Sequence, residues 1–458
     1  MAPETIGSST PDINSRASAD IREGDYAGPS SISNSGPDQP LKPITPEYRE
    51  VVASLSRSII RTTAGYDAVL RAQNMPSIIE CYAYRPRPYE VDTQITREEA
   101  IAKFAEHARK IDEIGLKKLP SEWIYIRDSQ LGLAAYLREQ DRLAKGEPKT
   151  PYDEFLTIVS GYAPRMIPRE YQQKTLEEIT EVLASMGERF NPNDYESIRR
   201  AIRKRHEDGK LNSQDAVERV LRRADRRNRS ELAKLLGPEV HSVKFQLEWE
   251  EANVFWRFYE DMSSGGENIL RANWHERHRE SYDIGLADMY GGHEPEHFII
   301  GHHIARAVKK GEIDPAAGLL TIPGPTGFQM EGLAQTIGDI AEYDVTQDGR
   351  LAVLLYRLDK YDIVNGLFRA EQGEPTEEIV QDREFNFRGI DERRRTLRDG
   401  LRNPFDRAFL PNYGRSDYAI MQIQERVGSV KAFIPYWHSR PLVSQQFINP
   451  PLEHLVRF

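Results

Sequence analysis

Apolar residues recur at helical spacing along most of this chain, whereas the alternating pattern of a strand is rare. Val51, Leu55 and Ile59 show this spacing, and Thr96 followed by Glu99 forms the capping box that opens a helix. Proline and glycine punctuate most of the gaps between helical stretches. We therefore expect helices over residues 47–75, 96–118, 128–145, 150–160, 170–188, 194–208, 213–236, 243–262, 295–310, 327–345, 349–371 and 415–427.

Strand signals are weak and confined to two places, residues 244–248 and 318–327. The sequence thus predicts a mainly α protein, a large helical architecture with few short strands. A length of 458 residues leaves room for more than one domain. Residues 1–44 are rich in Ser, Pro, Gly, Asp and Asn, and we expect a flexible tail there. The remainder divides into an N-terminal helical region, 45–230, and a C-terminal helical region, 231–458, which contains most of the histidines.

Charge and composition limit the functions that this chain can have. The formal net charge is −10, which argues against a general nucleic-acid binder. No apolar run approaches the roughly 18–20 residues that a membrane helix needs, so no membrane partner is expected. The N-terminus lacks the basic and apolar segments of a secretory signal, and the single cysteine, Cys81, cannot form an internal disulfide. We expect a cytoplasmic protein, and the oligomeric state, including a homo-oligomer, stays open.

Six of the eleven histidines lie between residues 275 and 303. Within this segment, residues 293–297 read His-Glu-Pro-Glu-His, which fits the H-E-x-x-H pattern of zinc hydrolases. On a helix, His293 and His297 would project from one face onto one ion. Glu294 would then lie beside the metal-bound water and take its proton. The pattern is short and occurs by chance, but a nearby carboxylate, Glu331, strengthens it.

Pro295 complicates this arrangement, because proline inside a helix removes a hydrogen bond and clashes with the preceding turn. The first turn of a helix tolerates proline, so a helix capped by Gly292 or His293 would keep the i, i+4 geometry. If the helix instead begins at Pro295, the ligands become His297 with His302 or His303. In that register Glu296 replaces Glu294 as the general base. The two alternatives are close, and His293 with His297 ranks first.

Glu331 is the candidate third metal ligand. It begins a helix-like stretch in which Glu331, Gln335 and Asp339 form a polar stripe, as expected of a ligand with supporting partners. An ordinary amphipathic helix with its polar face in water fits the same stripe equally well, and the upstream histidines favour the ligand. Two further residues are candidates for substrate binding. Arg415 lies in a loop-like stretch suited to a substrate carboxylate, and Tyr290 is a hydrogen-bond donor near the histidines.

The segment His293–His297 followed by Met330-Glu331-Gly-Leu-Ala resembles the gluzincins, zinc metallopeptidases that take two histidines from H-E-x-x-H and a glutamate from a later helix. Residues 290–370 also resemble a mainly bacterial family of all-helical, peptidase-like proteins. That family carries His-Glu before Pro-Gly-His-His, then Glu-Gly-Trp and Asp-Thr-Gly-Leu-His. The chain departs from it at five places: the Glu296–His297 order is reversed, and Ile300, Leu333, Val364 and Phe368 replace the Pro, Trp, Asp and final His.

These observations lead to three hypotheses. The leading one is a metal-dependent hydrolase, with zinc, that acts on a peptide, amide or small acyl substrate through a metal-activated water. The second is a non-haem iron enzyme, because a His/His/Glu ligand set also suits iron. The third is a catalytically divergent helical binding protein, which the departures from the family pattern motivate.

Overall fold

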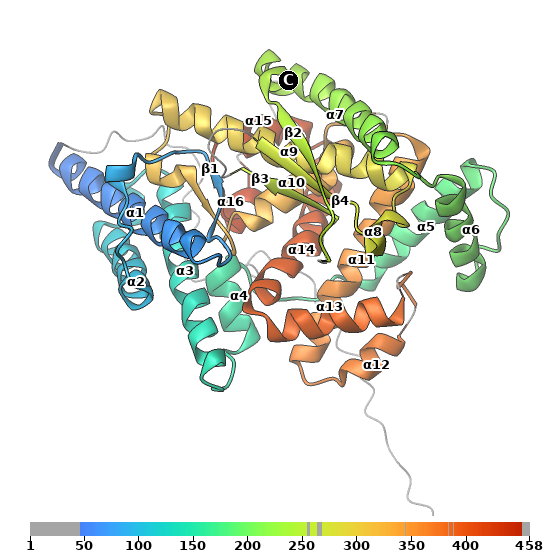
Figure 1. The fold of residues 1–458 in the computed structure, drawn as a ribbon, viewed down its shortest axis with the longest axis horizontal. Helices are drawn as coiled ribbons and strands as arrows, with labels where there is room; N and C mark the ends of the chain where they lie inside the picture. The colour runs from blue at the N-terminus through green and yellow to red at the C-terminus, as the bar shows by residue number, and fades with distance from the viewer. Residues whose placement is uncertain are drawn as a thin grey trace, which may run out of the picture.

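The computed structural model describes residues 46–253, 257–262, 268–343, 345–382, 384–387 and 389–450. The predicted tail, residues 1–44, lies outside this part of the chain. Helices dominate the described residues, and the few strands are short, so the mainly α prediction is confirmed (Figure 1). The first seven α-helices are α1 Pro46–Ala72, α2 Arg97–Ile114, α3 Glu122–Ala144, α4 Tyr152–Ser160, α5 Arg169–Ser185, α6 Tyr195–Asp208 and α7 Gln214–Leu236.

The second half of the chain contains nine further helices among the described residues. The capping residues that open them include Asp283 for α9, Thr346 for α11 and Asn403 for α14. The bounds are α8 Glu276–Arg279, α9 Ile284–Lys310, α10 Gly327–Ile340, α11 Gln347–Glu371, α12 Thr376–Gln381, α13 Ile390–Arg402, α14 Pro404–Val427, α15 Ile434–Ser439 and α16 Ser444–Ile448.

Five strands form two small sheets. β1 (Ile79–Tyr82) pairs antiparallel with β5 (Leu319–Thr321). In the other sheet the order is β2-β4-β3, where β4 (Asn268–Asn273) runs parallel to β2 (Phe245–Glu250) and antiparallel to β3 (Phe258–Asp261). An isolated bridge between Cys81 and Met262 links the two sheets. This bridge brings β1 and the end of β3 together, although they lie far apart in the sequence.

The predicted helix over 243–262 is wrong, because this segment forms β2 and β3. The alternative strand signal at 244–248 is the correct one. Phe245, Leu247 and Trp249 alternate with polar residues, and two of these three side chains pack against aromatic partners. Phe245 stacks on Phe298 of α9 with ring centroids 5.6 Å apart, and Trp249 meets Trp274 at the same separation. The packing of these side chains on one face therefore favours a strand over a helix in this segment.

α9 runs through the middle of the molecule, and most of its residues between Gly285 and Gly301 are buried. It packs against α7, α10, α11 and α15 (Figure 1). Gly291 allows the close approach to α7, because a Cβ there would lie 2.4 Å from the carbonyl oxygen of Leu221. The helix begins well before Pro295, so the expectation that it starts at residue 292, 293 or 295 is wrong. Packing on several sides keeps the helix continuous even though Pro295 removes one backbone hydrogen bond.

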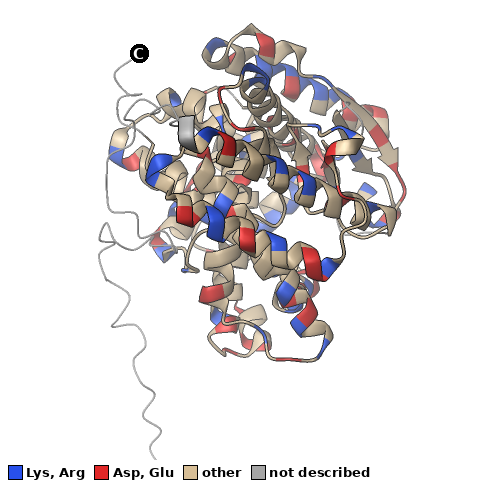
Figure 2. Cartoon of the chain, turned by 90° about the vertical axis from the view of Figure 1, so that its left-hand side faces the viewer, with Lys and Arg blue, Asp and Glu red and all other residues tan. Residues whose placement is uncertain are grey.

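The main hydrophobic core joins helices from both predicted regions, from Val52 in α1 to Ile448 in α16. The predicted boundary near residue 230 falls inside α7. A smaller cluster joins α5, α6 and α11 around Ile179 and Leu354. Within the described residues, none of the helices combines the length and the apolar character that crossing a bilayer requires. Acidic and basic residues are interspersed along the helices of the face that Figure 2 presents.

Candidate metal centre

His293 and His297 lie one turn apart on α9 and point to the same place. Their Nε2 atoms are 3.4 Å apart, and the side chains are 6% and 1% exposed. Glu294, between them on the helix, is also buried. Among the described residues, these three form the group of potential ligands whose donor atoms all lie within 4.8 Å of one another. The i, i+4 arrangement that ranked first from the sequence is therefore the one that the fold adopts.

Glu331, in the first half of α10, places a carboxylate beside His293. Its Oε2 lies 3.6 Å from Nε2 of His293, and its side chain is 2% exposed. Tyr413 of α14 donates a hydrogen bond to this carboxylate. The predicted third ligand, Glu331, thus lies beside His293 in the interior, although α10 begins 17 residues after α9 ends. In the described part of the chain, the donor atoms that all lie within 4.8 Å of one another belong to His293, Glu294 and His297.

Two further carboxylates reach the site from the strands. Oε1 of Glu260, on β3, lies 3.9 Å from Nε2 of His297. Glu260 is hydrogen-bonded to Glu294 and to Glu80, which comes from β1. A hydrogen bond between two carboxyl groups requires a proton on one of them. The bridge between Cys81 and Met262 explains why Glu80 and Glu260 are neighbours.

Burial of so many carboxylates makes them hard to ionise. Desolvation and the charge of Glu260 raise the pKa of Glu294 well above its usual value, and the pKa of Glu80 in the same way. Desolvation also raises the pKa of Glu331 to about 7, and it lowers the pKa of His293 to about 4. Without a cation at the site, the fold therefore favours protonated Glu80 and Glu294 and a neutral His293.

Aromatic residues and one lysine line the site. The ring of Tyr290 lies 6.1 Å from that of His293, and Tyr356 of α11 lies at the same distance. Lys360, one turn after Tyr356, is 8% exposed, and its Nζ lies 4.4 Å from the ring centroids of both Tyr356 and Tyr413. Its positive charge favours the ionised form of Glu331, which partly offsets the effect of desolvation, and it favours the neutral form of His293. Tyr290, a predicted substrate-binding residue, is therefore beside the candidate ligands.

Glu296 faces away from the histidine pair. Its Oε1 lies 2.6 Å from Nε2 of His438, and both side chains are fully buried. Nδ1 of His438 donates to the carbonyl oxygen of Ile434, so its Nε2 is the atom available to Glu296. This pair joins α9 to α15. The position of Glu296 therefore fits a packing role, and the structure places Glu294, not Glu296, beside the ligands.

His302 and Arg415 are not brought into the site. The ring of His302 lies 5.8 Å from that of His303, which in turn neighbours His438 on the far side of α9. Arg415 is buried inside α14, within hydrogen-bonding reach of the carbonyl oxygen of Arg165 and over the ring of Tyr418. The loop expected around residue 415 is helical instead. Burial within the helix explains why Arg415 is not in a substrate-facing loop.

Sequence reasoning missed Glu80, Glu260 and Lys360. Glu260 was assigned to a helix, and no local pattern marks Glu80. Lys360 carried a usable signal, because it follows Tyr356 at i+4 on a largely apolar helix, where a buried lysine is uncommon.

The donor set fits a tetrahedral zinc ion. Zinc binds imidazole nitrogen at about 2.0–2.1 Å, so two tetrahedral nitrogen ligands lie roughly 3.4 Å apart. The Nε2 atoms of His293 and His297 are 3.4 Å apart. Oε2 of Glu331 is a buried atom without a hydrogen-bond partner. A buried carboxylate oxygen left unpaired is costly unless it binds a proton or a cation.

Comparisons with known proteins leave the function open. No protein-family model matches the chain, and no curated protein matches it. Among solved structures, it is similar to "the putative lipoprotein from Colwellia psychrerythraea", with 12% identity, a TM-score of 0.49, and coverage of 89% of this chain and 76% of that one. It is also similar to "a putative lipoprotein of unknown function from Shewanella oneidensis", with 14% identity, a TM-score of 0.45, and coverage of 89% and 79%. At this level, neither likeness carries an argument about function.

Proposed function

We propose that this chain is a zinc-dependent hydrolase that cleaves a peptide, amide or small acyl substrate. The observation that carries the proposal is that two buried potential ligands lie within reach of Nε2 of His293. Nε2 of His293 lies 3.4 Å from Nε2 of His297 and 3.6 Å from Oε2 of Glu331. Three protein ligands leave one position of a tetrahedral ion open, which is the pattern of catalytic rather than structural zinc sites.

His293, His297 and Glu331 would hold the ion. Zinc at this position supplies Lewis acidity toward a carbonyl oxygen and makes water more acidic. Glu294 is the residue that would move the proton, because it lies between the two histidines on α9 and its carboxylate lies within 4.8 Å of their donor atoms. Desolvation raises the pKa of Glu331, and the charge of Lys360 and the hydrogen bond from Tyr413 partly offset this by favouring the ionised carboxylate.

Metal content is the decisive test. The purified protein should contain about one zinc ion per chain by elemental mass spectrometry, and His297→Ala should lose it. His302→Ala is the matched control, because it removes a histidine from the same helix outside the site. Absence of metal from the wild-type protein after zinc loading would overturn the proposal.

Catalysis is tested by exchanging the two glutamates of the motif separately. Glu294→Gln should retain zinc and lose at least about a hundredfold in kcat toward a peptide or amide substrate, the usual contribution of a general base. Glu296→Gln should retain most activity, because it lies on the far side of the helix with His438. Equal losses in the two variants would contradict the assignment of Glu294.

Non-haem iron is a second candidate, favoured by the additional oxygen donors. Glu260 lies 3.9 Å from His297, and Glu294-x-x-His297 matches the spacing used by helical iron and manganese proteins. Such a site binds more carboxylates than a catalytic zinc ion needs. Iron in the purified protein, together with oxygen consumption during turnover, would replace the hydrolase proposal.

A further inference from the structure

Gln335 is the member of the polar stripe on α10 that the candidate site leaves unexplained. Glu331, one turn earlier, is the candidate ligand, and Asp339, one turn later, forms an ion pair of 2.6 Å with Arg357. Gln335 is 6% exposed, and among the described residues neither its Nε2 nor its Oε1 has a hydrogen-bond partner. A buried carboxamide without partners lowers stability, so its presence points to a ligand that completes it.

Gln329, on the same helix, shows what a structural glutamine looks like in this fold. It is fully buried, and its Nε2 donates hydrogen bonds to the carbonyl oxygens of Trp437 and Arg440. Its Oε1 accepts a hydrogen bond from the backbone N–H of Leu442. These bonds join α10 to α15 and the segment that follows it. Gln335 makes no such bond to a described residue, so a role in joining elements does not account for its carboxamide.

Gln335 lines a small cavity beside the candidate metal centre. The cavity has a volume of about 30 Å³, and its wall includes His293, Arg227 and Asp288. This volume has room for about two water molecules. Nη2 of Arg227 lies 3.1 Å from Oδ2 of Asp288. Nε of Arg227 and Oδ1 of Asp288 are buried atoms without a hydrogen-bond partner in the described structure.

The wall of the small cavity offers both donors and acceptors but little net charge. The charges of Arg227 and Asp288 offset each other, and the carboxamide of Gln335 is neutral. A neutral group that both donates and accepts hydrogen bonds therefore matches this wall better than an ion does. An amide group has this character, since its N–H donates and its carbonyl oxygen accepts. Its oxygen and nitrogen fill about the space of two water molecules.

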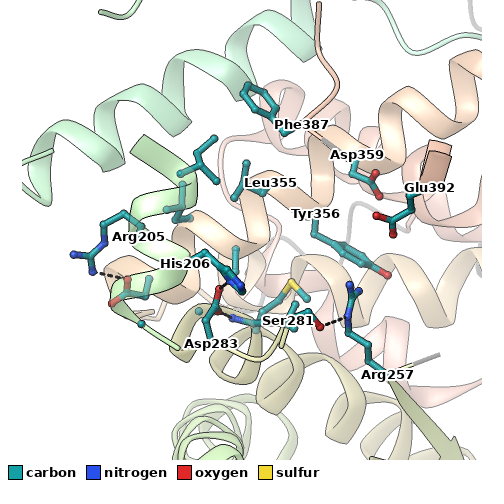
Figure 3. Close-up of a pocket in the computed structure, with 18 of the residues that line it drawn as sticks. Arg205, His206, Arg257, Ser281, Asp283, Leu355, Tyr356, Asp359, Phe387 and Glu392 are labelled. Atoms are coloured by element: carbon teal, nitrogen blue, oxygen red, sulfur yellow. Dashed lines mark hydrogen bonds and ion pairs between the residues drawn. The ribbon is translucent and has the colours of Figure 1, made fainter. Parts of the chain in front are cut away.

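A larger cavity adjoins the small one and gives space for the remainder of a substrate. It has a volume of about 390 Å³ and lies between α6, the start of α9 and α11 (Figure 3). Met289 and Tyr356 line both cavities. Apolar side chains, among them Leu286, Leu351 and Phe387, contribute to the larger wall. An amide group in the small cavity could thus carry an apolar substituent that extends into the larger one.

We propose that Gln335 binds the scissile amide group of the substrate and selects amides over esters. The amide N–H donates to Oε1 of Gln335, and the carbonyl oxygen lies on the His293 side of the small cavity. The inference rests on the proposed function, because it names which of the peptide, amide and acyl substrates the site takes. A site that hydrogen-bonds a substrate N–H rejects an analogue without it, because the buried group of the protein is then left unpaired.

Binding of two small probes tests the inference without turnover. The probes are N-methylacetamide and butan-2-one, which have the same shape and differ in the N–H group. In an NMR titration of the full chain, the side-chain amide signals of Gln335 are identified by their absence from Gln335→Met. These signals should shift with N-methylacetamide, which should bind at least about tenfold more tightly than butan-2-one. Equal binding, or a cavity that holds only water and leaves the signals unmoved by both probes, would overturn the proposal.

Two variants separate ligand binding from a structural role. Gln335→Met keeps the length of the side chain, and it should weaken binding of N-methylacetamide about tenfold while leaving butan-2-one unchanged. Its free energy of unfolding should stay the same or rise, because an unpaired carboxamide is removed. Gln329→Met is the matched control, which should lower stability by breaking the bonds to α15 and Leu442. An equal loss of stability in the two variants would make Gln335 structural and refute the inference.

Turnover distinguishes this inference from the proposed function. The substrates are the p-nitroanilide and the p-nitrophenyl ester of N-acetyl-leucine, and Gln335→Met should lower kcat/KM about tenfold more for the anilide than for the ester. If N-methylacetamide binds selectively at Gln335 but neither substrate is hydrolysed, the amide site stands and the hydrolase proposal fails. If both are hydrolysed and the ratio of their kcat/KM values is the same in the wild type and Gln335→Met, the hydrolase proposal stands and the amide site fails.

Discussion

Substitution of Gly291 by alanine tests the packing that holds α9 in place. A Cβ at this position would lie 2.4 Å from the carbonyl oxygen of Leu221 and 2.7 Å from Cβ of Ala224, both on α7. These contacts are roughly 1 Å shorter than van der Waals distance. The oxygen belongs to the backbone and the Ala224 side chain has no rotamers, so neither can turn aside. The two helices would have to separate.

The magnitude follows from two opposing effects. Overpacking a buried contact costs about 1–3 kcal/mol, and we expect the upper end because backbone must move. Alanine recovers about 1 kcal/mol over glycine inside a helix. Gly291→Ala should therefore lower the free energy of unfolding by about 2 kcal/mol. The neighbour Gly292 is the control, since a Cβ there meets only Oη of Tyr343, at 3.3 Å. Gly292→Ala should leave stability unchanged or raise it by up to about 1 kcal/mol.

Urea unfolding followed by far-UV circular dichroism measures both variants against the wild type, in the presence of a chelator so that metal does not contribute. The expected difference between the two variants is about 2–3 kcal/mol. Equal stability of Gly291→Ala and Gly292→Ala would refute the reasoning, because it would mean that α7 and α9 are not in close backbone contact at Gly291.

Two further predictions concern the far side of α9. Burial lowers the pKa of His303 from 6.5 to about 3, so between these pH values the unfolded chain binds a proton that the folded chain does not. The free energy of unfolding should therefore fall as the pH falls through this window, by about 1.4 kcal/mol per pH unit from this residue. His303→Gln should flatten the pH dependence measured by urea unfolding, and an unchanged slope would contradict the argument. His438→Ala leaves the buried Glu296 carboxylate without its partner and should cost about 3–5 kcal/mol, whereas Glu296→Gln keeps a hydrogen bond and should cost far less. Thermal melts of the two variants compare these losses, and similar melting temperatures would argue against the pair.

The sequence predicts the part of the site that is local. His293, Glu294 and His297 lie within five residues, and helical spacing alone places the two imidazoles together. Local sequence does not predict the start of α9, because Pro295 favours a helix that begins beside it. Packing of the surrounding helices outweighs that preference, and Asp283 caps the helix instead. The mainly helical architecture is also predictable, because helical periodicity, like the spacing of the two histidines, is a property of local sequence.

The carboxylates from the strands could not be predicted in this way. Glu80 and Glu260 are separated by 180 positions of sequence, and the bridge between Cys81 and Met262 makes them neighbours. His302 illustrates the opposite error, since closeness in sequence to His297 suggested a ligand. Five residues along a helix turn a side chain roughly 140° away, and the structure places His302 accordingly, outside the site.

The origin of the donors in two sheets and two helices affects how the protein can be divided. A fragment beginning at residue 231 would retain Glu260, Glu331 and both histidines, but it would lack Glu80. It would also lack β1, which pairs with β5, and most of α7, including Leu221 beside Gly291. Expression of the histidine-rich half alone would therefore yield the motif without the walls that hold its side chains together. Functional work on this protein requires the chain from at least α1 through α16.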